Sequence, residues 1–171
     1  SAQQVYVGIY GLGVWFPVMF AAVAGLMSIA SFTNSKLVMR LGMRRLSHGA
    51  LIGFTSVSGA MALLAALGPV PFPLFLALFA AAMVFFGGIG SNFNAIGMEP
   101  LGALAGTASS VQGFFQTVGG ALVGAGIGQL FDGTVLPLSL GFFCVGALAL
   151  VSVIIAEKGK LFSVGASAPK H

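Results

Sequence analysis

Long stretches without a charged side chain dominate this sequence. No Asp, Glu, Lys or Arg precedes Lys36, and none lies between Arg45 and Glu99. Only 6% of the 171 residues are charged and 58% are hydrophobic, whereas soluble domains average about 25% charged residues and roughly 45–50% apolar ones. Lipid, not water, suits a surface of this composition, so we expect a membrane protein.

Five apolar runs are long enough to cross a bilayer. A hydrocarbon core about 30 Å thick takes about 20 helical residues, because a helix rises about 1.5 Å per residue. Only helices and closed barrels satisfy their backbone in lipid, and these runs are too long and uniform for barrel strands. We predict an all-α membrane protein with five transmembrane helices, over residues 12–35, 47–68, 73–97, 107–131 and 136–156. Residues 1–157 would form this one domain, and 158–171 a polar cytoplasmic tail.

The positive charges predict which way the helices cross. Residues 34–46 hold four of the seven Lys and Arg: Lys36, Arg40, Arg44 and Arg45. Because cytoplasmic loops collect Lys and Arg, we place this segment in the cytoplasm. The proline-rich turn 68–73 and the turn 132–135 then lie outside, and every Lys and Arg falls on the cytoplasmic side.

Two segments carry a family resemblance. The first, "RLGMRR", is similar to a cytoplasmic loop motif of major facilitator superfamily transporters, which Arg40, Gly42, Arg44 and Arg45 match. The second, residues 94–138, resembles the end of helix ten, the following loop and helix eleven of the Bcr/CflA-type multidrug efflux family. Its matching residues are Asn94, Glu99, Pro100, Ala105, Gly106, Thr107, Ala108 and Ser109.

The resemblance implies a partial major facilitator superfamily fold, helices eight to twelve of twelve. It implies a fragment of a proton-coupled antiporter for drugs or small metabolites in the bacterial inner membrane. Its partners would be the lipid bilayer, the missing N-terminal half of the transporter, a small-molecule substrate and protons. On this view the five helices alone do not transport.

The fourth apolar run combines glycines with two glutamines. Gly120, Gly124 and Gly128 recur every four residues on one helical stripe, so we expect close helix packing, either static or at an interface that slides. Gln112 and Gln116 continue the stripe. In lipid they need partners, which interhelical hydrogen bonds or a wet substrate cavity would supply.

The third run ends in the polar, aromatic segment "FFGGIGSNFN". Phe85, Phe86, Asn92 and Asn94 are candidates to border a cavity for an apolar, weakly polar substrate. The alternative is helix packing by glycine, with each Asn bonded to a neighbouring helix. Because no Asp, Glu, Lys or Arg lies within the spans, no proton-coupling residue is identifiable in them.

Polar residues near the cytoplasmic end offer simpler interpretations. Glu99 would pair with Arg44 or Arg45, as a lock or as an ordinary surface ion pair. His48 would be a solvated interfacial side chain or a proton carrier. Cys144 has no second cysteine to bond.

We expect no enzyme activity, cofactor, metal site or nucleic-acid partner. The alternative function is a non-transporting membrane subunit or helical oligomer that associates through the glycine-rich helix.

Overall fold

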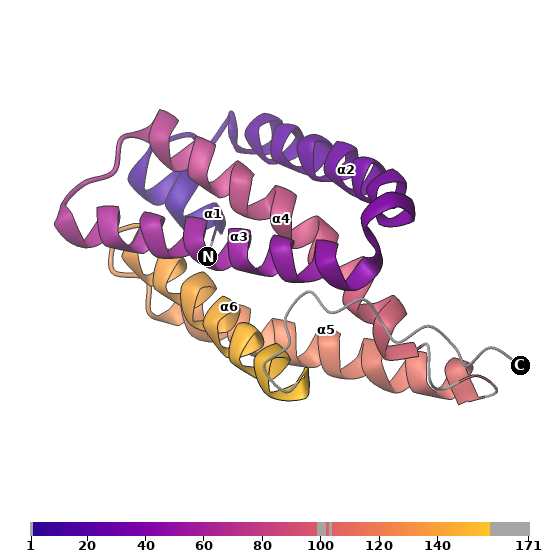
Figure 1. The fold of residues 1–171 in the computed structure, drawn as a ribbon. Helices are drawn as coiled ribbons and strands as arrows, with labels where there is room; N and C mark the ends of the chain where they lie inside the picture. Colours follow the sequence, from indigo (N-terminus) through magenta and orange to yellow (C-terminus); the bar gives the residue numbers. More distant parts are fainter. Residues whose placement is uncertain (1, 99–101, 103, 158–171) are drawn as a thin grey trace, which may run out of the picture.

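The computed structural model describes residues 2–98, 102 and 104–157. Their regular structure is entirely helical (Figure 1). Two short pieces come first, namely α1 (Ala2–Gln4) and a π-helical turn, η1 (Val5–Ile9). Five long helices follow: α2 (Phe16–Leu41), α3 (Met43–Leu67), α4 (Phe72–Met98), α5 (Ala105–Gln129) and α6 (Leu136–Ala156). The all-α prediction is confirmed for the part of the chain that the structure describes.

Four of the five long helices are long and apolar enough to cross a membrane: α2, α3, α4 and α6. They indicate a multi-pass membrane protein. Helix α5 has 25 residues but does not qualify among the described segments. Its glutamines and numerous glycines lower its hydropathy. Four of the five predicted transmembrane helices are therefore supported by length and composition, and α5 as a fifth stays a prediction.

The basic segment 34–46 is helical, which corrects its prediction as a loop. Helix α2 continues to Leu41 and α3 begins at Met43, so Gly42 alone separates them. Gly42 adopts a φ of 82°, which glycine reaches without a side-chain clash. Its N–H donates a hydrogen bond to the Val38 carbonyl, 2.9 Å away, and this closes the last turn of α2.

Helix α3 lies at the centre of the helical packing. It packs along α4 on one side and α6 on the other, while α2 packs mainly against α4 (Figure 1). Eight residues of α3 are buried, among them Leu51, Phe54 and Met61. Helix α5 lies at the edge of the bundle beside α6.

The segment from Ala2 to Tyr10 joins this core, which the sequence pattern did not predict. Val5 and Tyr6 are fully buried. The Tyr6 ring meets four phenylalanine rings edge-on, from Phe16 at the start of α2 and from Phe72, Phe75 and Phe79 of α4, with centroids 5.6–6.2 Å away. The Tyr10 hydroxyl donates a hydrogen bond to the Val70 carbonyl at 2.8 Å. Burial raises the pKa of Tyr6, with the neighbouring Tyr10 as a smaller cause.

The described charges divide between the two ends of the bundle. Arg44, at the start of α3, contacts Glu157, just after α6, so the α2–α3 junction and the end of α6 lie at one end. The α3–α4 and α5–α6 turns lie together at the other end (Figure 1), and Asp132 belongs to the second of these turns. The helices therefore alternate in direction as the charge pattern predicts.

Candidate functional site

A cavity of about 500 Å³ separates α5 from α3, α4 and α6. We call it the α5 cavity. Its lining is apolar except for one amide side chain, Gln116. The residues that line it are Phe54, Met83, Phe86, Phe115, Gln116, Gly119, Gly120, Val123, Gly124, Ile127, Phe142 and Val145.

The glycines of α5 keep this cavity open. A β-carbon added at Gly119, Gly120 or Gly124 would meet no described atom within 4 Å. Gly120 and Gly124 therefore pack against no helix within the described residues, and the close packing of the stripe Gly120, Gly124 and Gly128 stays a prediction. These two glycines border a space instead, while Gly128 is half-buried.

Close helix packing does depend on glycine, but elsewhere. A β-carbon at Gly146 of α6 would lie 2.7 Å from the Thr55 hydroxyl oxygen of α3, and one at Gly87 of α4 would lie 3.1 Å from Met27 of α2. These glycines let neighbouring helices approach, as small residues do in membranes. They do not recur every four residues, so the spacing argument did not select them.

Aromatic rings form one wall of the α5 cavity. The Phe54 ring centroid lies 6.0 Å from that of Phe86 and 5.8 Å from that of Phe142. Phe86 is 47% exposed although it projects between helices. Such a wall offers broad apolar contact and few directional bonds, which suits a ligand that is largely apolar.

Gln116 supplies the polar group of this cavity. It is exposed, and no hydrogen bond joins its side chain to another described residue. Gln112, one turn earlier, is half-buried and does not line the cavity. The structure thus brings Gln116 together with Phe86, Gly120 and Gly124, and leaves Gln112 out of the group.

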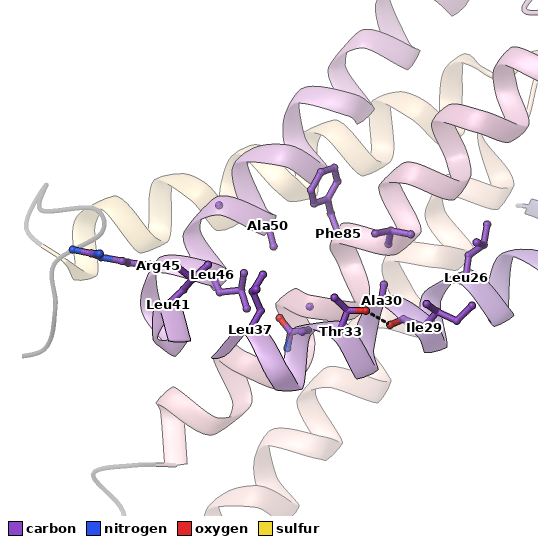
Figure 2. A pocket seen from close by; sticks show the side chains of 14 residues that line it. Leu26, Ile29, Ala30, Thr33, Leu37, Leu41, Arg45, Leu46, Ala50 and Phe85 are labelled. Atoms are coloured by element: carbon purple, nitrogen blue, oxygen red, sulfur yellow. Dashed lines mark hydrogen bonds between the residues drawn. The ribbon is translucent and has the colours of Figure 1, made fainter. Parts of the chain in front are cut away.

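Phe85 faces a different cavity from Phe86. A space of about 640 Å³ lies between α2, α3 and α4, and we call it the α2 cavity (Figure 2). Phe85 lines it together with Asn34 and Arg45. Consecutive residues of a helix point about 100° apart, and here the two phenylalanines face different sides of α4. The expected single site is therefore divided.

Asn92 has a partner that the sequence did not reveal. Its amide nitrogen donates to the Asn34 side-chain oxygen at 2.9 Å, and Asn34 returns the bond at 3.0 Å. This reciprocal pair joins α4 to α2. A β-carbon at Gly88 would lie 3.2 Å from the Asn34 oxygen, so glycine makes room for the pair. Asn94 is exposed and lines neither cavity.

The residues at the Arg44 end of the bundle also differ from expectation. Arg44 donates from one nitrogen to both carboxylate oxygens of Glu157, at 2.7 and 2.9 Å. Glu99, the predicted partner, lies outside the described residues. His48 is 1% exposed, and its ring centroid lies 6.3 Å from that of Phe93, so the prediction of a solvated histidine is wrong. Arg40 is exposed near the end of α2.

Comparison with known proteins gives this site no precedent. No family model, no curated protein and no solved structure matches the chain. The resemblance to Bcr/CflA-type transporters therefore stays a prediction.

Proposed function

We propose that these helices belong to a secondary active transporter that exports drugs or small metabolites by exchange with protons. The α5 cavity carries the proposal. It offers an aromatic wall, a glycine-lined wall and one unsatisfied amide, which is the chemistry expected for a largely apolar substrate. The family resemblance of residues 34–46 and 94–138 adds the transport direction, the bacterial inner membrane and the missing N-terminal half.

The weak attachment of α5 supports the same proposal. None of its described residues is buried, whereas α3 and α4 are anchored on several sides. A transporter exposes its binding site by moving one group of helices against another. A helix that borders the cavity and contributes little to the core is suited to that movement.

An accumulation assay tests the proposed function. The gene from which this chain is read is expressed in bacteria without their own efflux pumps, and uptake of a neutral lipophilic dye is followed by fluorescence. Gly120→Leu fills the cavity and Gln116→Leu removes its amide, so both should raise dye accumulation to the level of empty cells. Asn94→Ala changes a residue outside the cavity and should export normally.

Two results would refute the proposal. Normal export by Gly120→Leu would exclude the α5 cavity as the substrate site. Dye export by the chain from Ser1 onward, expressed alone, would contradict the need for a further transporter half.

The second candidate is a membrane subunit that associates through α5. Its specific support is the row of exposed apolar residues on this helix, including Phe114 at 62% and Leu122 at 69% exposure. Chemical crosslinking in membranes separates the two functions. An oligomer should give a crosslinked dimer that Gly124→Leu abolishes, while a transporter should remain a single chain. Seven further apolar spans encoded upstream of Ser1 would also favour the transporter.

A further inference from the structure

The α2 cavity is an apolar groove with a cation at one end. Its walls are mainly aliphatic and come from α2, α3 and α4. Figure 2 shows Arg45 at the Leu41–Leu46 end of the groove, with its side chain extending away from Phe85 and Leu26. The guanidinium therefore lies at the end of the bundle that carries the other described cations.

The groove is longer than the hydrocarbon part of one bilayer leaflet. Its lining residues on α2 run from Leu26 to Leu41, which at about 1.5 Å per residue is roughly 22 Å. Half of a hydrocarbon core is about 15 Å. A single acyl chain entering at the Arg45 end can therefore lie in the groove past the middle of the membrane.

The groove is open on the outer side of the described helices. Val23 is the one buried residue of α2, and Leu26 and Ile29 on the groove wall are 47% and 65% exposed. Gly49 and Ala50 of α3 leave room nearer the Arg45 end, since a β-carbon at Gly49 would meet no described atom within 4 Å. A lipid can enter from the side without unfolding a helix.

Arg45 differs from its neighbour Arg44 in its charge balance. Arg44 is bonded to the Glu157 carboxylate. Arg45 is exposed and forms no ion pair with any residue in the described ranges. A free guanidinium at the membrane surface binds phosphate through several N–H groups at once, and each Arg there attracts anionic lipid.

We propose that the α2 cavity binds one anionic phospholipid of the surrounding leaflet. One acyl chain lies along the groove between Leu26 and Leu41, and the phosphate bonds to Arg45. The lipid fills the space between α2 and the α3–α4 pair and so holds α2 in place. This site is separate from the α5 cavity and does not depend on the proposed transport function.

Native mass spectrometry of the intact chain tests this site. The protein is purified in a mild detergent and titrated with dioleoylphosphatidylglycerol, with dioleoylphosphatidylcholine and inorganic phosphate as separate probes. We expect one tightly held phosphatidylglycerol per chain, weaker phosphatidylcholine binding and no detectable phosphate binding. Arg45→Gln should weaken phosphatidylglycerol binding about five-fold, the effect of one surface charge. Gly49→Leu should abolish it by filling the groove.

Matched controls separate this site from general attraction to the cationic end. Arg40→Gln removes a charge of the same region outside the groove, and Gly25→Leu adds a side chain in open space outside it. Both should bind phosphatidylglycerol as the wild type does. If Gly49→Leu does not fold by circular dichroism, Ala30→Leu fills the same groove from α2.

The proposal is overturned by any of three outcomes. Equal losses in Arg40→Gln and Arg45→Gln would mean that the lipid is held by the charge of the whole end. Unchanged binding in the groove-filling variants, or equal binding of phosphatidylcholine, would mean that no specific anionic-lipid site exists there.

Discussion

Helices α3 and α5 have the same length and opposite surroundings. Each has 25 residues, yet eight residues of α3 are buried and none of the described residues of α5 is. Both helices contain glycines, and from the sequence alone each glycine would be expected to allow close helix packing. Gly59 of α3 and Gly146 of the neighbouring α6 mark helix contacts, whereas Gly119, Gly120 and Gly124 of α5 line a cavity.

This difference teaches how glycine acts in a membrane helix. The absence of a side chain lets another helix approach, but it creates a cavity where no helix approaches. The residues opposite decide between these outcomes. A stripe of glycines therefore predicts a smooth face, and the neighbouring helix determines whether that face is packed or open.

The largest expected effect comes from adding the same side chain to both kinds of glycine. Gly146→Leu forces atoms against Thr55 and Phe54, and overpacking of this kind costs about 1–3 kcal/mol. Gly120→Leu enters open space and should leave stability unchanged or raise it slightly. Thermal unfolding in detergent measures both. Equal destabilisation by the two variants would remove the distinction between packed and open glycines.

The Asn34–Asn92 pair tests how much a polar contact between closely packed helices contributes to stability. Replacing either residue with Ala should cost about 0.6–2 kcal/mol, because the remaining amide loses its partner in the membrane interior. The double variant should cost less than the sum of the two singles, since both remove one interaction. Asn94→Ala is the exposed control and should have no effect. Strict additivity of the two losses would show that the pair is not coupled.

The Arg44–Glu157 ion pair should contribute less. The two side chains are 37% and 18% exposed, so water and salt screen the pair, and Glu157→Gln should cost about 0.2–1 kcal/mol. The cost should fall further in about 1 M salt, where charges are screened within about 3 Å. The same melting measurement at two salt concentrations checks this, and a cost that is independent of salt would argue against an electrostatic role.

Asp132, in the turn between α5 and α6, should show the smallest effect. Hydrogen bonds from the Thr134 hydroxyl and then the Thr134 N–H lower the pKa of its carboxyl. The stabilisation is therefore complete above the ordinary carboxyl pKa of about 3.9 and is lost as the pH falls through the lower folded-state value. Melting curves of Asp132→Asn and wild type should approach each other only in strong acid. A difference that grows towards acid pH would reverse this sign.

The sequence predicted most of the helical arrangement from the positions of its turns. Residues 136–156 were predicted with the bounds that α6 has, and the prolines of 68–73 correctly placed the turn before α4. The prediction of the basic segment 34–46 as a loop was wrong, because Lys and Arg are good helix formers whose charged ends extend beyond the apolar region. A single glycine, Gly42, suffices to reverse the chain there.

The candidate site was less predictable because its members come together only in three dimensions. Helical periodicity assigns residues to faces but does not say which helix each face meets. Phe86 and Gln116 share a cavity, whereas Phe85 lines the α2 cavity. Asn92 is bonded to Asn34 of α2, a residue 58 positions away. The segment Ala2–Ile9, which buries Val5 and Tyr6, was missed because it is too short to show a helical period.

Thiol accessibility tests most directly whether α5 borders an open cavity. In a Cys144→Ser background, one cysteine replaces Gly120 in the cavity wall and another replaces Ser58, which is fully buried in α3. Each variant reacts with N-ethylmaleimide in detergent, and its rate is compared with that of the unfolded chain. The account predicts that the cysteine at position 120 reacts at nearly the unfolded rate and the one at 58 only after unfolding. Equal protection at both positions would contradict it.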